Sequence, residues 1–322
     1  MQFIRPQALH RGNHELRNNQ IRTTGPAHIL TLQEYAAALR NLGTKIVSGS
    51  GGVFWMENEH LSLIRMPTFD TQPLTEKEVN RVLRVGRTGI ISYLLEPSDR
   101  QIQNAFLYIC KNHNYRLENL PPSCRRNVRR GLSGLEIAHL TSDELLRHGW
   151  SAYADTRQRI GLSDGTPEQF HRRFGLRSKC SGHVFWGAWK GDVLAGFLSI
   201  VRVDRWAEVE GCFSMDAYLN LRPNDVLLYS VLSNYLCNEA CEVVSYGVSS
   251  VQNMPNESGL HAFKTKVGFE AKPVHRVFLP HPFIRPFVGR VGRWGLRRLL
   301  RFSPRNRRLL KAQGMISHML DS

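Results

Sequence analysis

The sequence predicts an α/β (α+β) protein in which a mixed, mainly antiparallel sheet is flanked by helices. Its composition is that of a globular chain, because 42% of the 322 residues are hydrophobic and 22% are charged. Residues 183–189, 193–203 and 206–213 are strand-like segments separated by short turns, a pattern typical of an antiparallel meander. Segments with helical periodicity alternate with strand-like segments before and after this meander. The length allows either two subdomains or one large domain.

The first half is expected to begin with a helix. Thr31 and Glu34 have the spacing of a capping box, so a helix should run from there to about Asn41. The glycine-rich stretch 49–52 lacks the Gly-Lys-Ser/Thr ending of a phosphate loop, and we interpret it as a hairpin turn. The remaining elements should be strands at 61–66, 89–95 and 115–120, with helices around 79–85 and 98–112 between them.

The second half is expected to contain the meander and the helices around it. A strand at 135–140 should be followed by a helix capped by Thr141 and by another with Pro167 at its first position. After the meander we expect a helix at 226–236, a strand at 243–247, a helix ending before Gly268 and a strand at 273–279. In the last of these helices, Leu260, Phe263 and Val267 form one apolar stripe.

The net charge of +16 favours an acidic partner, such as nucleic acid, a phosphorylated substrate or an anionic membrane face. One basic cluster lies in a short segment framed by two prolines and Gly131. Its arginines form two i, i+4 pairs and so share one broad helical face: Arg125, Arg126, Arg129 and Arg130. We expect this face to bind an anion or substrate, and the alternative is a solvated basic surface.

A second basic segment lies at the C-terminus. No acidic residue occurs between Phe283 and Leu320, and ten arginine or lysine residues alternate there with aromatic and aliphatic residues. This pattern predicts that residues 281–322 form a basic amphipathic helical tail that binds an anionic membrane surface. RNA, a phosphorylated substrate, or packing on the domain with solvated arginines are the alternatives.

Targeting and redox signals are weak. Residues 1–30 have no hydrophobic signal core and are expected to form a flexible polar arm. No apolar run approaches the ~18 residues of a membrane span. The six cysteines are scattered and include no CxxC pair, which indicates a reducing compartment. We therefore expect a cytoplasmic protein, held peripherally at the inner membrane face by the tail. No HExxH or tight Cys/His cluster is present, so no metal site is expected.

The order of elements between 141 and 280 resembles that of GNAT acyltransferases. Simple GNAT enzymes often end on a helix that reads Leu-Tyr-x-x-x-Gly-Phe, and here the same register reads Phe263-Lys264-Thr265-Lys266-Val267-Gly268-Phe269. Lysine in place of the tyrosine resembles the Fem-type branch. The segments Tyr115-Arg116-Leu117 and Ser123-x-x-Arg126-x-x-x-Arg130 are similar to the midsection of Fem-type proteins. The resemblance implies a tandem of two GNAT-like subdomains, which we place at 31–134 and 135–280.

This resemblance also implies an activity. Fem-type relatives include aminoacyl-tRNA-dependent cell-wall peptide transferases and acyl-CoA-type transferases of envelope or polysaccharide loci. We expect an N-acyltransferase that uses acyl-CoA as co-substrate and a small-molecule or lipid-linked saccharide as acceptor. One alternative is transfer from aminoacyl-tRNA, and another is a non-enzymatic protein that binds RNA or membrane. GNAT enzymes usually hold the coenzyme A pyrophosphate with a glycine-containing loop, whereas this chain has Arg222-Pro223-Asn224-Asp225 there.

Acyl transfer to an amine needs a base and a group that stabilises the oxyanion. Glu208 and Glu210 are the candidate bases, because alternate residues of a strand face the same way, although a polar outer face would show the same pattern. Lys264 is the candidate for an oxyanion or phosphate contact, and the alternative is a solvated helix lysine. Candidate cofactor-binding residues lie in the loop and at the strand end described above: Arg222, Asn224, Tyr246 and Ser249.

Overall fold

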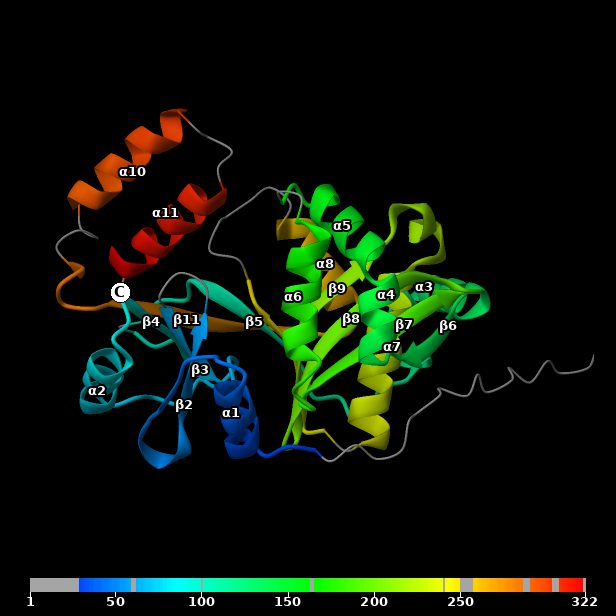
Figure 1. Cartoon of the computed structure of the whole chain (residues 1–322), viewed down its shortest axis with the longest axis horizontal. Helices are drawn as coiled ribbons and strands as arrows, with labels where there is room; N and C mark the ends of the chain where they lie inside the picture. The colour runs from blue at the N-terminus through cyan, green and yellow to red at the C-terminus, as the bar shows by residue number, and fades with distance from the viewer. Residues whose placement is uncertain are drawn as a thin grey trace, which may run out of the picture.

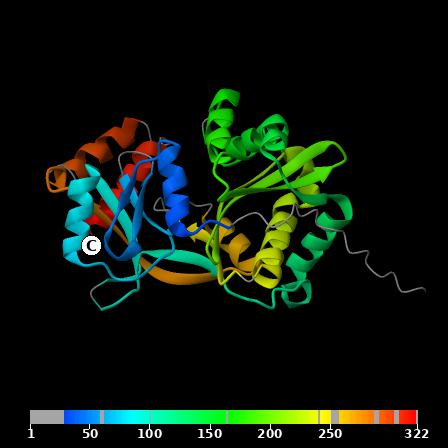
Figure 2. The same ribbon diagram turned by 60° about the horizontal axis from the view of Figure 1, so that its bottom comes forward.

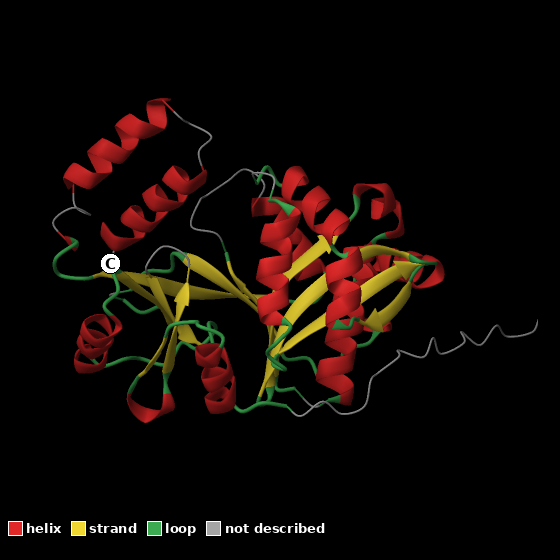
Figure 3. Cartoon of the chain, in the orientation of Figure 1, coloured by secondary structure: helices red, strands yellow, loops and turns green. Residues whose placement is uncertain are grey.

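The computed structural model describes residues 29–58, 62–99, 101–162, 165–239, 241–249, 257–285, 290–302 and 307–320. Within these ranges the chain forms one mixed, mainly antiparallel sheet of eleven strands with helices on both faces (Figures 1 and 3), which confirms the predicted fold class. The strand order is β1-β2-β3-β4-β11-β5-β10-β9-β8-β7-β6. Residues 1–28, and with them most of the predicted polar arm, lie outside the described ranges.

The first part of the chain builds one end of the sheet. Its elements are α1 (Leu32–Asn41), β1 (Ile46–Ser48), β2 (Phe54–Asn58), β3 (Ser62–Met66), α2 (Glu76–Gly86), β4 (Ile90–Leu95), β5 (Ala105–Cys110) and α3 (Pro122–Gly134). The capping box forms as predicted, with the Thr31 hydroxyl accepting from the Glu34 N–H and the Glu34 carboxylate accepting from the Thr31 N–H. A short turn at Ser50–Gly52 joins β1 to β2, which are antiparallel, so the predicted hairpin is confirmed.

Two predicted elements are wrong. Residues 105–110 form a central strand and not a helix: β5 pairs with β10 on one side and with β11 on the other. A continuous apolar run of this length has no period that separates a buried strand from a buried helix. Residues 115–120 form a 3₁₀ turn, Leu117–Asn119, and not a strand. Tyr115 before this turn is buried, and its hydroxyl donates to the Val267 carbonyl at 2.5 Å.

The second part builds the other end of the sheet. Its elements are β6 (Glu136–His139), α4 (Ser142–His148), α5 (Trp150–Arg159), α6 (Pro167–Arg177), β7 (His183–Lys190), β8 (Val193–Val203), β9 (Trp206–Ser214), α7 (Pro223–Ser233), β10 (Val243–Val248), α8 (Glu257–Lys266) and β11 (Glu270–Pro280). Strands β6 to β9 are successively antiparallel, which confirms the meander, and β10 runs parallel to β9.

Strand β11 joins the two ends of the sheet. Its residues 270–274 pair with β5, and its residues 275–280 pair with β4. Figure 2 shows this orange strand crossing from one lobe of the molecule to the other. The division into subdomains at residues 134 and 135 stays a prediction, and the hydrogen-bonded sheet is continuous across it.

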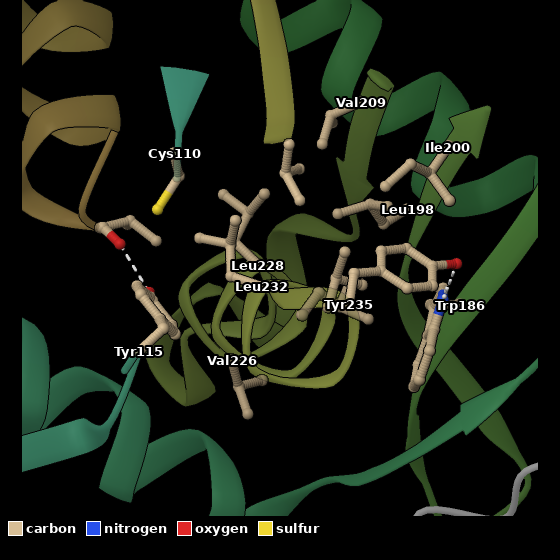
Figure 4. Packing of buried hydrophobic residues seen from close by; sticks show 14 of the residues in the cluster. Cys110, Tyr115, Trp186, Leu198, Ile200, Val209, Val226, Leu228, Leu232 and Tyr235 are labelled. Atoms are coloured by element: carbon tan, nitrogen blue, oxygen red, sulfur yellow. Dashed lines mark hydrogen bonds between the residues drawn. The ribbon is translucent and has the colours of Figure 1, made fainter. Parts of the chain in front are cut away.

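The main core lies between the sheet and the helices α3 and α7. Trp186 on β7 and Tyr235 in the π-helical turn after α7 (Asn234–Asn238) are fully buried there, and the indole N–H donates to the Tyr235 hydroxyl at 3.2 Å (Figure 4). Helix α3 approaches α7 at Gly131, where an added Cβ would lie 2.7 Å from the Val226 Cβ. A second core, rich in phenylalanine, lies under α5 and α6 on the other face of the sheet.

After β11 the chain forms helices α10 (Arg290–Phe302) and α11 (Arg307–Leu320), which agrees with the predicted helical tail. Helix α11 packs on β11, and α10 packs on α11 (Figure 1). None of the described helices is long and apolar enough to cross a bilayer.

Candidate functional site

The candidate site lies where strands β9 and β10 stop pairing. Their parallel ladder contains only three residue pairs and ends at Glu208 and Ser245. Strand β9 continues to Ser214, whereas β10 shifts register after Ser245 and follows β5. Gly247 makes this turn possible, because its φ of +67° lies in the left-handed region that favours glycine. The carboxyl ends of parallel strands are a usual place for ligand sites in open sheets.

Glu208 is the last residue of β9 that pairs with β10, and its carboxylate accepts a hydrogen bond from the Thr68 hydroxyl. Thr68 follows β3, so this contact brings the first part of the chain to the second. Burial raises the pKa of Glu208 to about 7, with the Glu210 charge adding to the rise and Thr68 opposing it. A carboxylate with this pKa is partly ionised at neutral pH and can exchange a proton with a substrate.

Glu210 is two residues further along β9, and its carboxylate is fully engaged. Oε1 lies 2.9 Å from Arg177 Nη2, while Oε2 accepts from the Ser199 hydroxyl at 2.7 Å and lies 3.3 Å from His183 Nδ1. Burial by itself would raise the pKa of Glu210, but the positive charge of Arg177 and the hydrogen bonds from His183 and Ser199 lower it to about 2. The two predicted bases therefore share a strand and differ in chemistry, and the arrangement favours Glu208 as the base.

A second layer holds Glu210 in place. The carboxylate can only accept, so the His183 proton lies on Nδ1, and Nε2 lies 3.3 Å from the Tyr35 hydroxyl. Burial raises the pKa of Tyr35 well above its ordinary value, so the phenol stays protonated. Tyr35 belongs to α1, which thereby contacts β7. Glu210 thus connects β9 to α6, β7, β8 and, through His183, α1.

Lys264 on α8 is buried, with only 4% of its surface exposed. Its ammonium donates to the Tyr246 carbonyl at 3.0 Å and lies 4.1 Å and 4.5 Å from the ring centroids of Tyr108 and Tyr246. Burial lowers the pKa of Lys264 to about 8. Among the described residues no carboxylate lies within ion-pair distance of it. The alternative of a solvated lysine is therefore wrong, and the site offers a desolvated positive charge held by two aromatic rings.

The buried side of α8 differs from the predicted stripe. Val267 is buried as expected, but Leu260 is 50% exposed and Lys264 takes the inward position. His261, one turn before Lys264, lies 3.0 Å from the Tyr108 hydroxyl through Nδ1. Sequence reasoning missed Tyr108, because residues 105–110 were expected to be helical, and it also missed His261 on α8. His261 had a weak signal, since positions i and i+3 share a helix face.

Glu208 and Lys264 lie on opposite faces of the sheet, on either side of the place where β9 and β10 separate. Trp206, two residues before Glu208, packs against Phe69 and Val243 on one face. Tyr246, whose carbonyl binds Lys264, packs with the α7 core on the other face. A group inserted between the strands could therefore meet a base from one face and a cation from the other.

The predicted cofactor-binding residues lie on the Lys264 side or at the strand ends. Arg222 is exposed and precedes α7, whose N-terminus has no side-chain cap. Asn224 Oδ1 lies 3.3 Å from Cys212 Sγ on β9. The Asp225 carboxylate is 2.7 Å from Lys266 Nζ and accepts from Asn127 Nδ2 at 3.0 Å, so its charge is compensated. Ser249 Oγ accepts from the Phe106 N–H at 3.0 Å.

The basic face of α3 points away from the core. Cys124, Val128 and Gly131 are buried, whereas Arg126, Arg129 and Arg130 are exposed and Arg125 is half-buried. Arg125 donates to the Glu118 carbonyl at 2.9 Å. No ion pair links the four arginines to a carboxylate within the described ranges. Their roles, like those of the residues above, stay predictions.

A cavity of about 350 Å³ lies between α2 and the end of β11, lined by residues that include Leu74, Tyr93 and Leu279, and it contains none of the predicted site residues. In the part of the chain that the structure describes, no three His, Cys, Asp or Glu side chains are grouped so that they could hold a metal ion.

No protein-family model and no curated protein matches the chain in sequence. Solved structures do match its fold. FemX superposes with a TM-score of 0.55 at 10% identity, covering 80% of this chain and 93% of that one. The C-terminal domain of a predicted lysylphosphatidylglycerol synthetase from Agrobacterium fabrum gives 0.52 at 14% identity, covering 75% and 86%. A conserved protein of unknown function from Bacteroides thetaiotaomicron gives 0.50 at 13% identity, covering 76% and 88%.

Proposed function

We propose that this chain, whose fold is GNAT-like and of the Fem type as predicted, is an N-acyltransferase acting on an amine or hydroxyl of a cell-envelope, polysaccharide or lipid-linked precursor. The observation that carries the proposal is the place and acidity of Glu208. This carboxylate ends the β9–β10 ladder and has a pKa raised by burial to about 7. A base of that strength beside separated strands is what amine activation at neutral pH requires.

The proposed reaction uses Glu208 on one face of the sheet and Lys264 on the other. The acceptor lies on the Glu208 side, where the carboxylate removes a proton as the nitrogen or oxygen attacks the acyl carbonyl carbon. The carbonyl π bond becomes an oxyanion, and the positive charge of Lys264 on the other side stabilises it. The bond from the acyl carbon to the leaving group then breaks, the carbonyl re-forms, and the proton passes to the leaving group. Glu208 returns to its ionised form.

The donor is proposed to be acyl-CoA. Helix α7 begins next to β9 with its first N–H groups not capped by a side chain, and Arg222 beside it is exposed. Helix N-termini attract phosphate. Asp225 would oppose an anion there, but Lys266 compensates its charge at 2.7 Å. These features support a phosphate-bearing donor even though the usual glycine pair is absent.

Aminoacyl-tRNA is the second candidate donor. The exposed arginines of α3 support it, because Arg126, Arg129 and Arg130 form no ion pair with a described carboxylate and tRNA offers a row of phosphates. The net charge of +16 also favours association with tRNA.

One calorimetric experiment tests both donors. The full chain is titrated with acetyl-CoA and then, separately, with unacylated tRNA. We expect acetyl-CoA to bind. Arg222→Ala should weaken this binding, while Lys190→Ala, at the exposed end of β7, should not. Binding of tRNA alone, weakened by Arg126→Ala with Arg129→Ala, would replace the coenzyme A proposal with the tRNA one. If neither ligand binds, the acyltransferase proposal fails.

A further inference from the structure

Helix α10 is the outer helix of the C-terminal pair. Several of its large apolar side chains are exposed to solvent. Trp294 is 64% exposed, Leu299 is 56% exposed and Phe302 is 80% exposed. The turn that leads to α10 adds Phe283, which is also largely exposed. Scattered single apolar residues are ordinary on protein surfaces, but four along one short segment indicate a surface that is covered in use.

The same side of α10 carries arginines. Positions i, i+4, i+7 and i+8 recur on one helix face, so Trp294, Arg298, Arg301 and Phe302 lie together. Arg298 and Arg301 are exposed, and the Arg298 guanidinium lies 5.6 Å from the centroid of the Trp294 indole ring. Leu296 and Leu300, on the opposite side, are half-buried. The outward face therefore combines aromatic and cationic groups, and the exposed Leu299 lies at its edge beside Phe302, three positions further along.

Charge identifies the partner. No acidic residue occurs from Phe283 to Leu320, so nothing in α10 or α11 neutralises the arginines or repels an anion. A phospholipid interface offers both things that this face needs, namely phosphates for the guanidinium groups and an acyl boundary for Trp294, Leu299 and Phe302. Nucleic acid would satisfy the arginines and stack on the rings, but Leu299 would gain nothing from it.

We propose that α10 lies flat on an anionic phospholipid bilayer, with Trp294, Leu299 and Phe302 in the headgroup–acyl boundary and Arg298 and Arg301 on lipid phosphates. Helix α11 connects this contact to β11, and β11 runs into the sheet that carries the candidate site. The proposal does not depend on acyl transfer, because vesicle binding is measured without substrate. If it holds together with the proposed function, the site is held close to lipid-linked acceptors.

The test is sedimentation of the full-length protein with vesicles of phosphatidylcholine alone or mixed with phosphatidylglycerol. We expect binding to the mixed vesicles only, and weaker binding as salt is added. The variant Trp294→Ala with Phe302→Ala should lose most of the binding. The variant Arg298→Gln with Arg301→Gln should bind about 25-fold more weakly, at about fivefold for each arginine.

A matched control removes the same charge elsewhere. Arg172 on α6 and Lys190 at the end of β7 are exposed, and Arg172→Gln with Lys190→Gln should leave vesicle binding nearly unchanged. If both charge variants lose vesicle binding equally, binding depends on net charge alone and the proposal is overturned. Equal binding of the wild-type protein to both kinds of vesicle would also overturn it.

The same measurements distinguish two other partners of the α10 face, namely nucleic acid and a second copy of the chain. If wild-type protein ignores vesicles but binds tRNA through Trp294 and Phe302, the face is a nucleic-acid surface. If the wild-type protein does not bind vesicles but is a dimer in sedimentation velocity, and the Trp294→Ala, Phe302→Ala variant is a monomer, the face contacts a second copy of the chain. Either result rejects the membrane assignment. Unchanged melting temperatures for all variants would show that the fold is intact.

Discussion

Glu208 and Glu210 lie two residues apart on β9, and the partners of each carboxylate set its charge state. Glu208 has one neutral partner, Thr68, so burial dominates and raises its pKa to about 7. Glu210 is also removed from water, but the charge of Arg177 and the hydrogen bonds from His183 and Ser199 more than offset that and lower its pKa to about 2. One carboxylate is thereby suited to proton transfer, and the other to holding helices and strands together.

The acid limb of the pH–rate profile should report Glu208. The base must be ionised, so kcat/KM should fall as pH drops below about 7. Removing the Thr68 hydrogen bond by Thr68→Val should raise the pKa of Glu208 and move this limb to higher pH, while Thr71→Val should not. Glu208→Gln should lower kcat by ~10²–10⁴-fold. If Thr68→Val leaves the acid limb at the same pH, or if Glu208→Gln keeps near wild-type turnover, Glu208 is not the base.

Stability should respond to the two carboxylates with opposite signs. The folded pKa of Glu210 is depressed, so its stabilisation is present above its unfolded pKa of about 4.3 and is lost as pH falls towards about 2. Its side chain is only 18% exposed, and its contribution should be on the order of 2 kcal/mol at neutral pH.

The folded pKa of Glu208 is raised, so stability is lost as pH rises from the unfolded pKa of about 4.3 to the folded pKa of about 7, and the full loss persists at higher pH. In thermal melts at pH 8, Glu210→Gln should therefore lower Tm and Glu208→Gln should raise it. The reverse order would show that the partners identified for the two groups are wrong.

At the scale of an element, α8 presents a lysine where helical periodicity predicts solvent exposure. The helix is placed by Val267 in the core and by the Tyr115 hydroxyl on the Val267 carbonyl, and this register points Lys264 inward. A buried ammonium without a carboxylate partner costs stability, and this cost is why we expect Lys264 to have a role other than packing.

Lys264→Met tests that role. Methionine keeps most of the volume and removes the charge, so kcat should fall by roughly 10²–10³-fold, as for an oxyanion donor. Tm should stay the same or rise, because the desolvated charge is gone. Lys264→Arg is the companion variant, since it keeps a charge with a different shape, and it should recover part of the activity. Full activity in the Met variant would return Lys264 to a packing role.

The contact between α3 and α7 depends on a missing side chain. Gly131→Ala would place a Cβ 2.7 Å from the Val226 Cβ, which forces the helices apart. Chemical denaturation should show a loss of about 1–3 kcal/mol. Gly259→Ala on α8 is the control, because no atom lies within 4 Å of its added Cβ, and it should be neutral or slightly stabilising. Similar effects of both changes would mean that helix propensity, and not packing, decides the outcome.

Elements marked by a short-range sequence pattern were predictable from the sequence. Elements whose type depends on the strands that pair with them were not. The capping box at Thr31, the hairpin at 49–52 and the meander depend on short-range patterns, and all form. Strand β5 is apolar throughout because both of its faces are buried, and such a run fits a helix equally well. Only the pairing of β5 with β10 and β11 decides between them.

The same distinction applies to the candidate site. Alternation along one strand placed Glu208 and Glu210 on the same side, and motif position singled out Lys264. Thr68, Arg177 and His183 come from distant segments and carry no local motif, so their contacts with the two carboxylates follow only from the tertiary structure. Nor could the sequence assign the two different pKa values, because these depend on those distant partners.

At the scale of the whole molecule, the sheet and the C-terminal helices form one continuous path from the proposed lipid contact to the site. Helix α10 rests on α11, α11 on β11, and β11 pairs with β5 beside β10 (Figure 1). If α10 lies on the bilayer, the orientation of the sheet relative to the membrane is fixed by packing and not by a linker.

Strand β11 also sets the order in which the protein can be completed on the ribosome. β4 and β5 are synthesised early. One edge of each strand pairs with β11, which is synthesised some 170 residues later. Until then both present unpaired backbone groups, which are templates for intermolecular pairing. Nascent chains stopped after residue 268 should therefore be more protease-sensitive and more dependent on chaperones than chains extended past residue 280. Equal protease resistance of the two would show that the early half closes without its last strand.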